Sequence, residues 1–356
     1  MKHNDNGHDS EIRLNLDLHD EYFNSKGRQK IPVTVCVAAL ADDRKSVVGI
    51  SDRMVTAADI EFEPLQTKIQ PITSSIVIMT AGDSSLNAEI ISQVAETVTE
   101  RITAKPDQWL RVADVAKLYQ EIAGKLSSQK AAAALLAPFG LDSESFISRQ
   151  SEMTPEFVEK MATELLNFST PYAQVIVTGV DTAGAHIFVV DNSEIVCYDK
   201  LGFASIGVGQ WHANSQLMFA YYAPGYPIAL ALWECFVAKR RAEVAPGVGY
   251  STDIFTIVGI GNYSPINELL VNLLKEIYDK LRTSEREAQN EAQKEWINVI
   301  SQAVKEATEQ SEQTQEIPAD PEPPADQRQL ESRQANDGDG SAPSDENELR
   351  KRAESS

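Results

Sequence analysis

The stretch IPVTVCVAAL-ADDRK-SVVGIS, residues 31–51, carries the clearest structural signal in the sequence. Its two apolar parts, 31–40 and 46–51, are rich in Val, Ile and Ala, which is typical of strands buried on both faces. The residues between them, 41–45, are small or charged and have the chemistry of a turn. The stretch therefore predicts a β-hairpin.

Hairpins followed by helices recur along the rest of the chain. Apolar runs predict further strands at 67–72, 75–81, 173–179, 185–190, 194–198 and 253–260. Helical spacing of apolar residues predicts helices at about 86–98, 108–126, 210–221, 227–244 and 265–310. Strand and helix do not alternate as they do in a doubly wound parallel sheet. The order instead predicts an α+β protein with two antiparallel sheets between helix layers.

The composition narrows the classes of function. The 356 residues include 53 acidic and 32 basic side chains, which gives a formal net charge of −21. Nucleic acids and anionic membranes bind clustered Lys and Arg, so this charge argues against both as partners. Hydrophobic residues make up 42% of the sequence, which is enough for a packed core.

Charge and apolar content also divide the chain into segments. Residues 311–356 contain twelve acidic and five basic residues but only three large aliphatic ones, so we expect a disordered acidic tail. We also expect a polar leader at 1–30, which would be a propeptide, and one large domain at 31–264 with a helical insertion at about 127–172. A long C-terminal helix is expected at 265–310.

Cysteine and histidine usage predicts neither disulfides nor a metal site. The three cysteines have no CxxC spacing, and the five histidines have no HxH or HxxxH spacing. The first residues lack the apolar core of a signal peptide, and the uncharged stretch 212–233 is interrupted by prolines. We therefore expect a cytoplasmic protein with no metal and no membrane span.

Three residues at the ends of predicted strands have a characteristic spacing. Asp52 lies in a Ser-Asp-Arg motif, Lys68 in Lys-Ile, and Gly82 ends Thr-Ala-Gly. Sixteen residues separate Asp52 from Lys68, and fourteen separate Lys68 from Gly82. These residue types at these separations resemble the strand-two aspartate, the catalytic lysine and the oxyanion-hole glycine of proteasome β-subunits and their bacterial relatives. Those proteins are N-terminal nucleophile (Ntn) hydrolases.

The resemblance covers about residues 31–126 and 173–260 and implies a fold. That fold is the four-layer αββα Ntn-hydrolase sandwich of two antiparallel sheets, here with a helical insertion and a long C-terminal helix. Further glycine motifs match the family: Gly179-Val180-Asp181, Gly207-x-Gly209 and Gly249-x-x-x-Asp253. The resemblance also implies a peptide or protein substrate, no cofactor and a homo-oligomeric ring. Nothing in the sequence indicates an ATPase partner.

A site of this family works through a threonine at a free N-terminus. Its hydroxyl is the nucleophile, and its α-amine, with a pKa of about 8, is the general base. An ammonium lowers the pKa of the hydroxyl, a carboxylate orients the ammonium, and a backbone N–H at a helix start stabilises the oxyanion. By resemblance, Lys68 is the ammonium, Asp52 the carboxylate and Gly82 the oxyanion donor.

Thr34 is the nucleophile that the resemblance assigns. It begins the first strand in the sequence Thr-Val-Cys-Val-Ala, which looks like the Thr-x-Cys-Val-Gly opening of the bacterial Anbu-type relatives. Removal of residues 1–33 would expose its amine, and the protein would then be a threonine-type endopeptidase. Thr34 precedes Asp52 by eighteen residues, about two more than in the family, and the turn at 41–45 accommodates the difference.

Four residues depart from the family pattern. Val33 stands where self-processing relatives have glycine, and Val208, Ala245 and Val248 replace hydroxyl or carboxylate residues. These departures favour a second hypothesis, a catalytically inactive structural or binding subunit that keeps its leader. A third hypothesis is an Ntn amidase that acts on a small molecule; no residue in the sequence indicates a particular pocket for it.

The residues assigned to the site also have simpler explanations. Lys68 is compatible with a surface lysine on the flank of a strand, and Asp52 with an exposed ion-paired turn. Threonine is common in strands, and glycine is favoured at a strand-to-helix turn whatever the function. The spacing of the residues is therefore the main argument for the site.

Two other clusters of reactive or charged residues have simpler explanations. Cys36 with His186 or His212 is an alternative nucleophile pair, but a cysteine within a strand is more often a small buried hydrophobe. The basic run at 239–241 comes near the end of a predicted helix, which predicts a solvated helix end.

Overall fold

A computed structural model of the chain describes residues 34–57, 60–191 and 194–315. The predicted leader lies outside the described residues, as does the predicted tail from residue 316 onward. The chain divides into two compact units after Ser284. The first unit contains both sheets and the candidate site; the described part of the second is a helical segment.

The predicted hairpin at 31–51 is confirmed. Strands β1 (Cys36–Ala41) and β2 (Ser46–Asp52) are antiparallel, with a register that runs from Cys36 opposite Ser51 to Ala41 opposite Ser46. Every residue of both strands is buried. The chain reverses through a run of three left-handed residues, 42–44, which lets four residues connect the strands.

Two five-stranded antiparallel sheets form the centre of the first unit. The first sheet has the order β10-β1-β2-β11-β12, where β10 is Phe203–Ile206, β11 is Thr252–Val258 and β12 is Tyr263–Pro265. The second sheet has the order β5 (Ile69–Pro71), β6 (Ile76–Gly82), β7 (Ala173–Asp181), β8 (Gly184–Val190) and β9 (Ile195–Cys197). A separate short hairpin pairs β3 (Val55–Ala57) with β4 (Ile60–Phe62).

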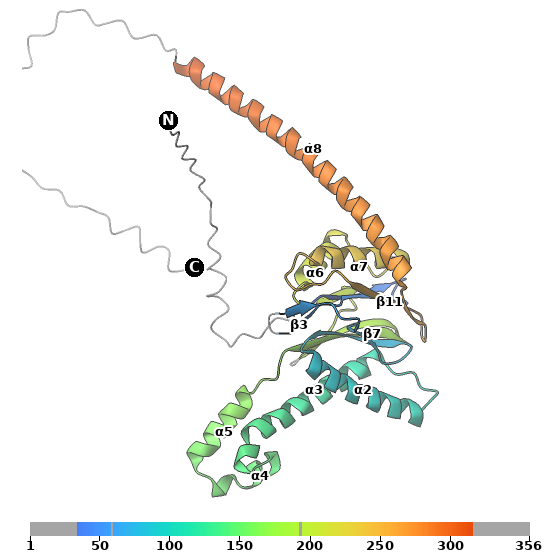
Figure 1. The fold of residues 1–356 in the computed structure, drawn as a ribbon, viewed down its shortest axis with the longest axis vertical. Coiled ribbons are helices and arrows are strands. Elements are labelled where there is room, and N and C mark those ends of the chain that lie inside the picture. The colour runs from blue at the N-terminus through green and yellow to red at the C-terminus, as the bar shows by residue number, and fades with distance from the viewer. Residues whose placement is uncertain (1–33, 58–59, 192–193, 316–356) are drawn as a thin grey trace, which may run out of the picture. The chain divides into compact units, whose positions relative to one another are not determined.

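The two sheets lie between two pairs of helices (Figure 1). Helices α6 (Gln210–Phe219) and α7 (Ile228–Ala242) pack on the first sheet, and α2 (Ser84–Ala104) and α3 (Val112–Leu135) pack on the second. The sheets pack against each other through a third apolar core. The expectation of a mixed α+β protein with two sheets sandwiched between helix layers is therefore confirmed.

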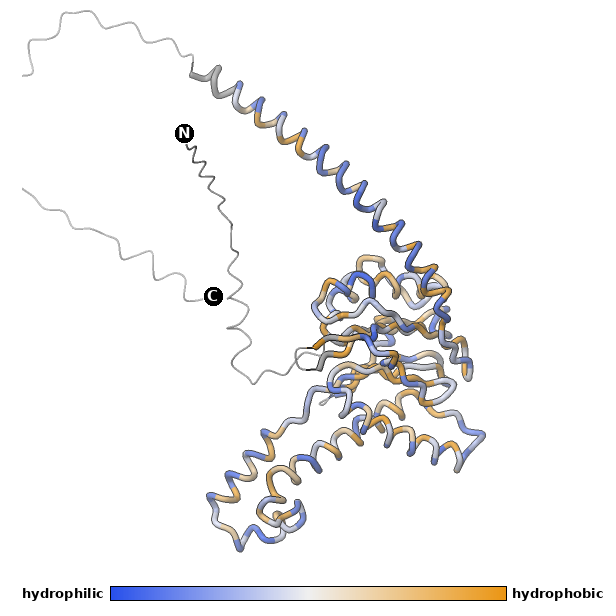
Figure 2. Tube along the Cα trace, in the orientation of Figure 1, coloured by the Kyte–Doolittle hydropathy of each residue, from blue (hydrophilic) through white to orange (hydrophobic). Residues whose placement is uncertain are grey.

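Strand β1 shows why the sequence of the hairpin is apolar without interruption. Its odd-numbered residues, including Val37 and Ala39, face α6 and α7. Its even-numbered residues, including Ala38 and Leu40, face the second sheet. Successive side chains of a strand point to opposite faces, so a strand between two cores needs apolar residues at every position. The same continuous apolar colour follows the central strands in Figure 2.

The predicted helical insertion consists of the end of α3 and four short elements. These are η1 (Ala137–Phe139), α4 (Ser143–Ser148), η2 (Gln150–Glu152) and α5 (Pro155–Asn167). A small core around Leu136, Phe146 and Met161 holds them together. Helix α3 continues to Leu135 rather than ending near residue 126, because the alanine-rich stretch at 131–134 has high helix propensity.

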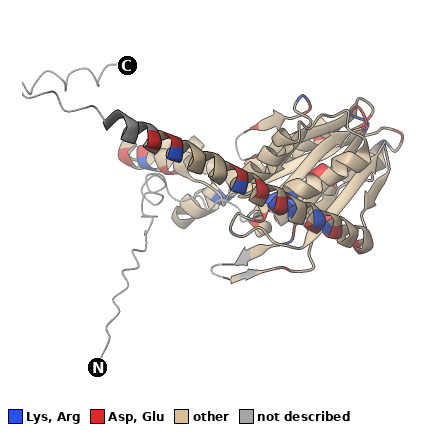
Figure 3. Ribbon diagram, turned by 90° about the horizontal axis from the view of Figure 1, so that it is seen from above, with Lys and Arg blue, Asp and Glu red and all other residues tan. Residues whose placement is uncertain are grey.

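The C-terminal helix α8 runs from Glu268 to Gln315, five residues past the predicted end at 310. In the first unit its residues Leu274 and Tyr278 are buried, and the Tyr278 ring lies edge-on to Phe236 of α7. In the second unit, residues 286–309 are exposed, and acidic and basic residues are interspersed along the helix (Figure 3). Across the described ranges, no helix combines the length and apolarity that crossing a bilayer requires.

Candidate active site

The hairpin of the first sheet supplies two of the predicted site residues. Thr34 is buried, with 2% exposure, and lies two residues before β1, which begins at Cys36 rather than at Thr34 as predicted. Asp52 ends β2 and is fully buried. The Asp52 amide donates to the carbonyl of Val35 at 3.2 Å, which continues the hairpin ladder by one step. The register of β1 and β2 therefore brings residues eighteen positions apart into contact.

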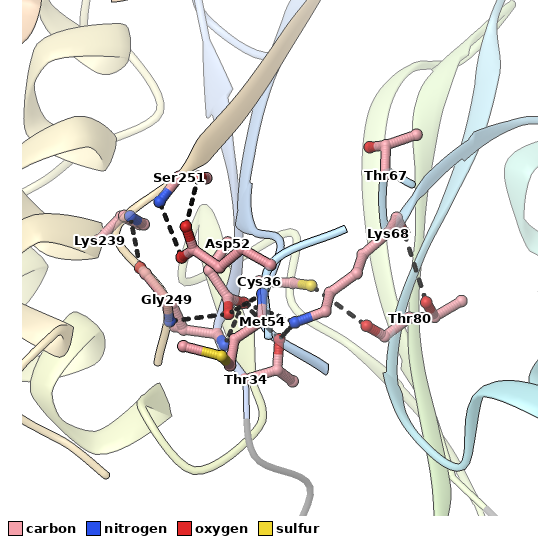
Figure 4. Close-up of polar contacts among 12 residues, drawn as sticks. Thr34, Cys36, Asp52, Met54, Thr67, Lys68, Thr80, Lys239, Gly249 and Ser251 are labelled. Atoms are coloured by element: carbon pink, nitrogen blue, oxygen red, sulfur yellow. Dashed lines mark hydrogen bonds and ion pairs between the residues drawn. The ribbon is translucent and has the colours of Figure 1, made fainter. Parts of the chain in front are cut away.

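The second sheet supplies Lys68. It lies just before β5, and its carbonyl accepts a hydrogen bond from the amide of Thr80 in β6 at 3.1 Å. Its Nζ lies 2.9 Å from Asp52 Oδ1 and also donates to the Thr34 hydroxyl. Only 13% of the Lys68 side chain is exposed. The ammonium thus crosses from one sheet to the other and reaches both residues of the hairpin (Figure 4).

Asp52 is held by five donors. Its Oδ1 accepts from the Val35 amide at 3.0 Å, from the Thr34 hydroxyl and from Lys68. Its Oδ2 accepts from the amides of Met54 and Gly249, both at 3.0 Å. An ionised carboxylate only accepts hydrogen bonds, so this set of donors stabilises the charge of a group that has no exposure to water. The position of the carboxylate fixes both the Thr34 hydroxyl and the Lys68 ammonium.

Gly82 ends β6 and precedes helix α2, as its predicted role requires. The contacts that join Thr34, Asp52 and Lys68 do not include it; it lies two residues along β6 from Thr80, which holds the Lys68 carbonyl. Its φ is +101°, and a Cβ there would collide with the carbonyl oxygen of Tyr172. The assignment of its N–H to an oxyanion therefore remains a prediction.

The backbone at Gly82 gives a stability prediction. We expect Gly82→Ala to lower the free energy of unfolding by roughly 2 to 5 kcal/mol, since it combines a strained φ with a backbone collision. Gly124→Ala is the matched control, because Gly124 is exposed within α3 and nothing lies within 4 Å of the added Cβ. We expect this control to raise the free energy by about 0.5 to 1 kcal/mol. Denaturant unfolding measures both, and equal values for the two variants would contradict the argument.

The turn Gly207-Val208-Gly209 lies against Thr34. The Gly209 amide donates to the Thr34 carbonyl at 3.1 Å, and a Cβ on Gly207 would collide with the Thr34 backbone. Val208 packs against the core beside α6 and α7. The turn thus reaches the site, but with an apolar side chain where the family has a hydroxyl.

Other hydroxyls near the site are bonded elsewhere. Ser205 bonds to the carbonyl of Gln210 at 3.0 Å and to the side chain of Asn214 at 2.7 Å. Ser251 bonds to both carboxylate oxygens of Glu63 through its amide and hydroxyl, and these bonds help to lower the pKa of Glu63 against its partial burial. Ala245 and Val248 are buried in the apolar core. Among the described residues, no further hydroxyl side chain bonds to Thr34 Oγ1.

Cys36 does not form the alternative nucleophile pair. Its thiol is fully buried and donates to the Thr80 carbonyl at 3.4 Å, and burial raises its pKa to about 12. His186 instead contacts Asp199 at 2.6 Å and Asp181 at 3.4 Å. The structure therefore supports the interpretation of Cys36 as a small buried apolar residue.

The cysteines give a second prediction. Only the thiolate is alkylated, and burial raises the pKa of all three thiols, so access of the reagent to the sulfur decides which cysteine reacts. We expect iodoacetamide at pH 8 to modify the exposed Cys197 in the folded protein and to leave the buried Cys36 and Cys235 unmodified. Peptide mapping measures the three sites, and unfolding in denaturant should make all three react. Rapid modification of Cys36 in the folded protein would contradict its burial.

Lys239 was missed by the sequence analysis. The basic run at 239–241 was expected to be a solvated helix end, but the Lys239 side chain is fully buried in α7. A usable signal existed, because Lys239 stands four residues after Cys235 and three before Ala242, on the apolar face of the helix. The prediction was wrong because three consecutive basic residues indicated exposure to water, although the helical period places Lys239 on the apolar face.

Metal binding has no candidate in the described ranges, since no three His, Cys, Asp or Glu side chains come together as ligands there. Comparison of the chain with protein-family models and with curated proteins finds no match. The contacts of Thr34 with Asp52 and Lys68 are therefore the main indication of function.

Proposed function

We propose that the protein is a threonine-type endopeptidase of the Ntn-hydrolase class, resembling proteasome β-subunits and their bacterial Anbu-type relatives. The observation that supports this proposal most is the Thr34 hydroxyl, which donates to Asp52 and accepts from the Lys68 ammonium. The two sheets and their helix layers suit the αββα fold of that class. The proposed substrate is a peptide or protein, and the proposed assembly is a ring of identical subunits.

In the proposed reaction, Thr34 is the first residue of the mature chain. Its α-amine accepts the hydroxyl proton, and Oγ1 attacks the carbonyl carbon of the scissile peptide bond. The nearby Lys68 ammonium favours the negative charge that develops on Oγ1, and Asp52 holds the ammonium in place. The proton passes to the leaving amine, and water then hydrolyses the ester between Thr34 and the acyl group.

The amine of Thr34 becomes available only when the bond between Val33 and Thr34 is cleaved. Intact-mass measurement of the purified protein tests this requirement. The proposal predicts a mature species that lacks residues 1–33. A chain that keeps all of these residues and also fails to hydrolyse a mixture of peptides would reject the proposal.

A second candidate function is a catalytically inactive subunit. It is favoured by the apolar side chains of Val208, Ala245 and Val248 and by the engagement of the Ser205 and Ser251 hydroxyls elsewhere. Such a subunit would keep Thr34 inside the chain. The same intact-mass measurement separates the two candidates, because the inactive subunit retains its leader.

A further inference from the structure

Lys239 carries a buried ammonium that bonds to a segment next to the candidate site. Its Nζ donates to Glu243 Oε1 at 2.6 Å, to the Gly249 carbonyl at 2.9 Å and to the Tyr250 carbonyl at 3.1 Å. An ammonium has three donors, so these three acceptors satisfy it completely. Burial lowers its pKa, and the neighbouring Glu243 carboxylate opposes that shift.

The segment that Lys239 holds is the one that reaches Asp52. The Gly249 carbonyl accepts from Lys239, while the Gly249 amide donates to Asp52 Oδ2 at 3.0 Å. One residue therefore connects the buried ammonium to the carboxylate that orients Thr34 and Lys68. Figure 4 shows this arrangement, with Lys239 on one side of Gly249 and the site residues on the other.

Burial of a lysine at this position is energetically unfavourable. Removing an ammonium from water carries a large desolvation penalty, and apolar side chains of similar volume often replace buried ion pairs without loss of stability. The neighbouring Ala245 and Val248 are themselves apolar and buried. The Gly249 carbonyl, however, needs a donor that an apolar residue does not provide, whereas the Tyr250 carbonyl also accepts from the Thr252 hydroxyl at 3.3 Å. Without Lys239 the segment would therefore have fewer contacts that fix its backbone.

We propose that Lys239 is a positioning residue, which orients the backbone of Gly249 so that its amide stays bonded to Asp52. This inference rests on the proposed function, because the carboxylate matters for catalysis only if Thr34 is the nucleophile. Lys239 touches neither Thr34 nor Lys68 in the described contacts; its effect reaches them through Gly249 and Asp52.

The test compares Lys239→Met with Arg240→Met in the full-length protein. Arg240 is the matched control, because it is the next residue of α7 and bonds to the same Glu243 carboxylate at 2.8 Å but not to the segment at 249–250. Hydrogen exchange of the Gly249 amide reports the geometry. The rate of labelling by a peptide vinyl sulfone, measured across pH, reports the reactivity of Thr34.

Lys239→Met is expected to accelerate exchange of the Gly249 amide at least tenfold and to slow labelling at least tenfold. The pH midpoint of labelling should also rise. The variant removes a positive charge and loosens an amide donor to Asp52, and both changes favour the protonated form of the general base. Arg240→Met should change neither exchange nor labelling, although it also lowers thermal stability.

The outcomes separate the two claims. Unchanged Gly249 exchange and unchanged labelling in a folded Lys239→Met protein would overturn the positioning role, even if its melting temperature falls. If Lys239→Met does not fold, Glu243→Gln weakens the hold on the ammonium while leaving it in place, and it should shift both readouts in the same direction. An unlabelled wild-type protein would instead reject the proposed function, and Gly249 exchange would still decide whether Lys239 holds the segment.

Discussion

Replacing Thr34 by alanine should abolish both maturation and peptide hydrolysis. The variant loses the only hydroxyl side chain, among the described residues, that contacts both Asp52 and Lys68. Loss of a nucleophile leaves only the catalysis that binding and electrostatics supply, so we expect a fall of about 10⁴-fold or more in hydrolysis. Intact mass should show the uncleaved chain, and peptide turnover should fall to background.

Two further variants control this prediction. Thr34→Ser keeps a hydroxyl, so it should process and hydrolyse peptides at a reduced but measurable rate. Thr99→Ala removes a threonine whose hydroxyl bonds only within helix α2 and should leave both reactions unchanged. If Thr34→Ala still matured and turned over peptides at the wild-type rate, Thr34 would not be the nucleophile.

Lys68→Met should have the next largest effect. The substitution keeps most of the side-chain volume but removes the ammonium that donates to Thr34 and lies 2.9 Å from Asp52. An electrostatic contact to the reacting group is worth 10² to 10³ in rate, so we expect about a 10³-fold fall in turnover. Steady-state peptide hydrolysis measures this change.

Folding of the Lys68→Met variant needs its own measurement. Four donors to Asp52 remain, so we expect the variant to fold with a lowered melting temperature. Lys45→Met is the matched control, because Lys45 is exposed in the turn between β1 and β2, and this variant should retain full activity. A folded Lys68→Met protein with turnover within tenfold of the wild type would exclude a catalytic role for the lysine.

Sequence periodicity was most informative where burial is complete. The strands β1 and β2 and the strands of the second sheet were predictable because each is a continuous or alternating apolar run. The strands β3, β4 and β12 were not predicted, since polar neighbours interrupt their few apolar residues and leave no period. Strand β10 was also missed, because Phe203–Ile206 is short and is followed by glycines.

Only the residues that contact Thr34 directly, Asp52 and Lys68, were predictable from the sequence. The resemblance in spacing predicted that Asp52 and Lys68 lie together, and the structure brings them into contact across the two sheets, because Asp52 ends β2 and Lys68 directly precedes β5. The contact between Lys239 and Gly249 depends on how α7 packs beside β2 and β11, which no local pattern encodes. The same is true of the Gly249 amide bond to Asp52, which joins residues 197 positions apart.

The net charge of −21 does not describe the site. The polar centre of the first unit contains two buried or nearly buried ammonium groups, Lys68 and Lys239, around one buried carboxylate, Asp52. The net acidity of the sequence therefore says little about the chemistry of the site.

The most direct test of the account is to identify the residue that a peptide vinyl sulfone modifies. The wild-type protein is incubated with the probe, digested and mapped by mass spectrometry. We expect a single adduct on Thr34, in a peptide in which Thr34 is the N-terminal residue. An unmodified Thr34 that is still bonded to Val33 would contradict it.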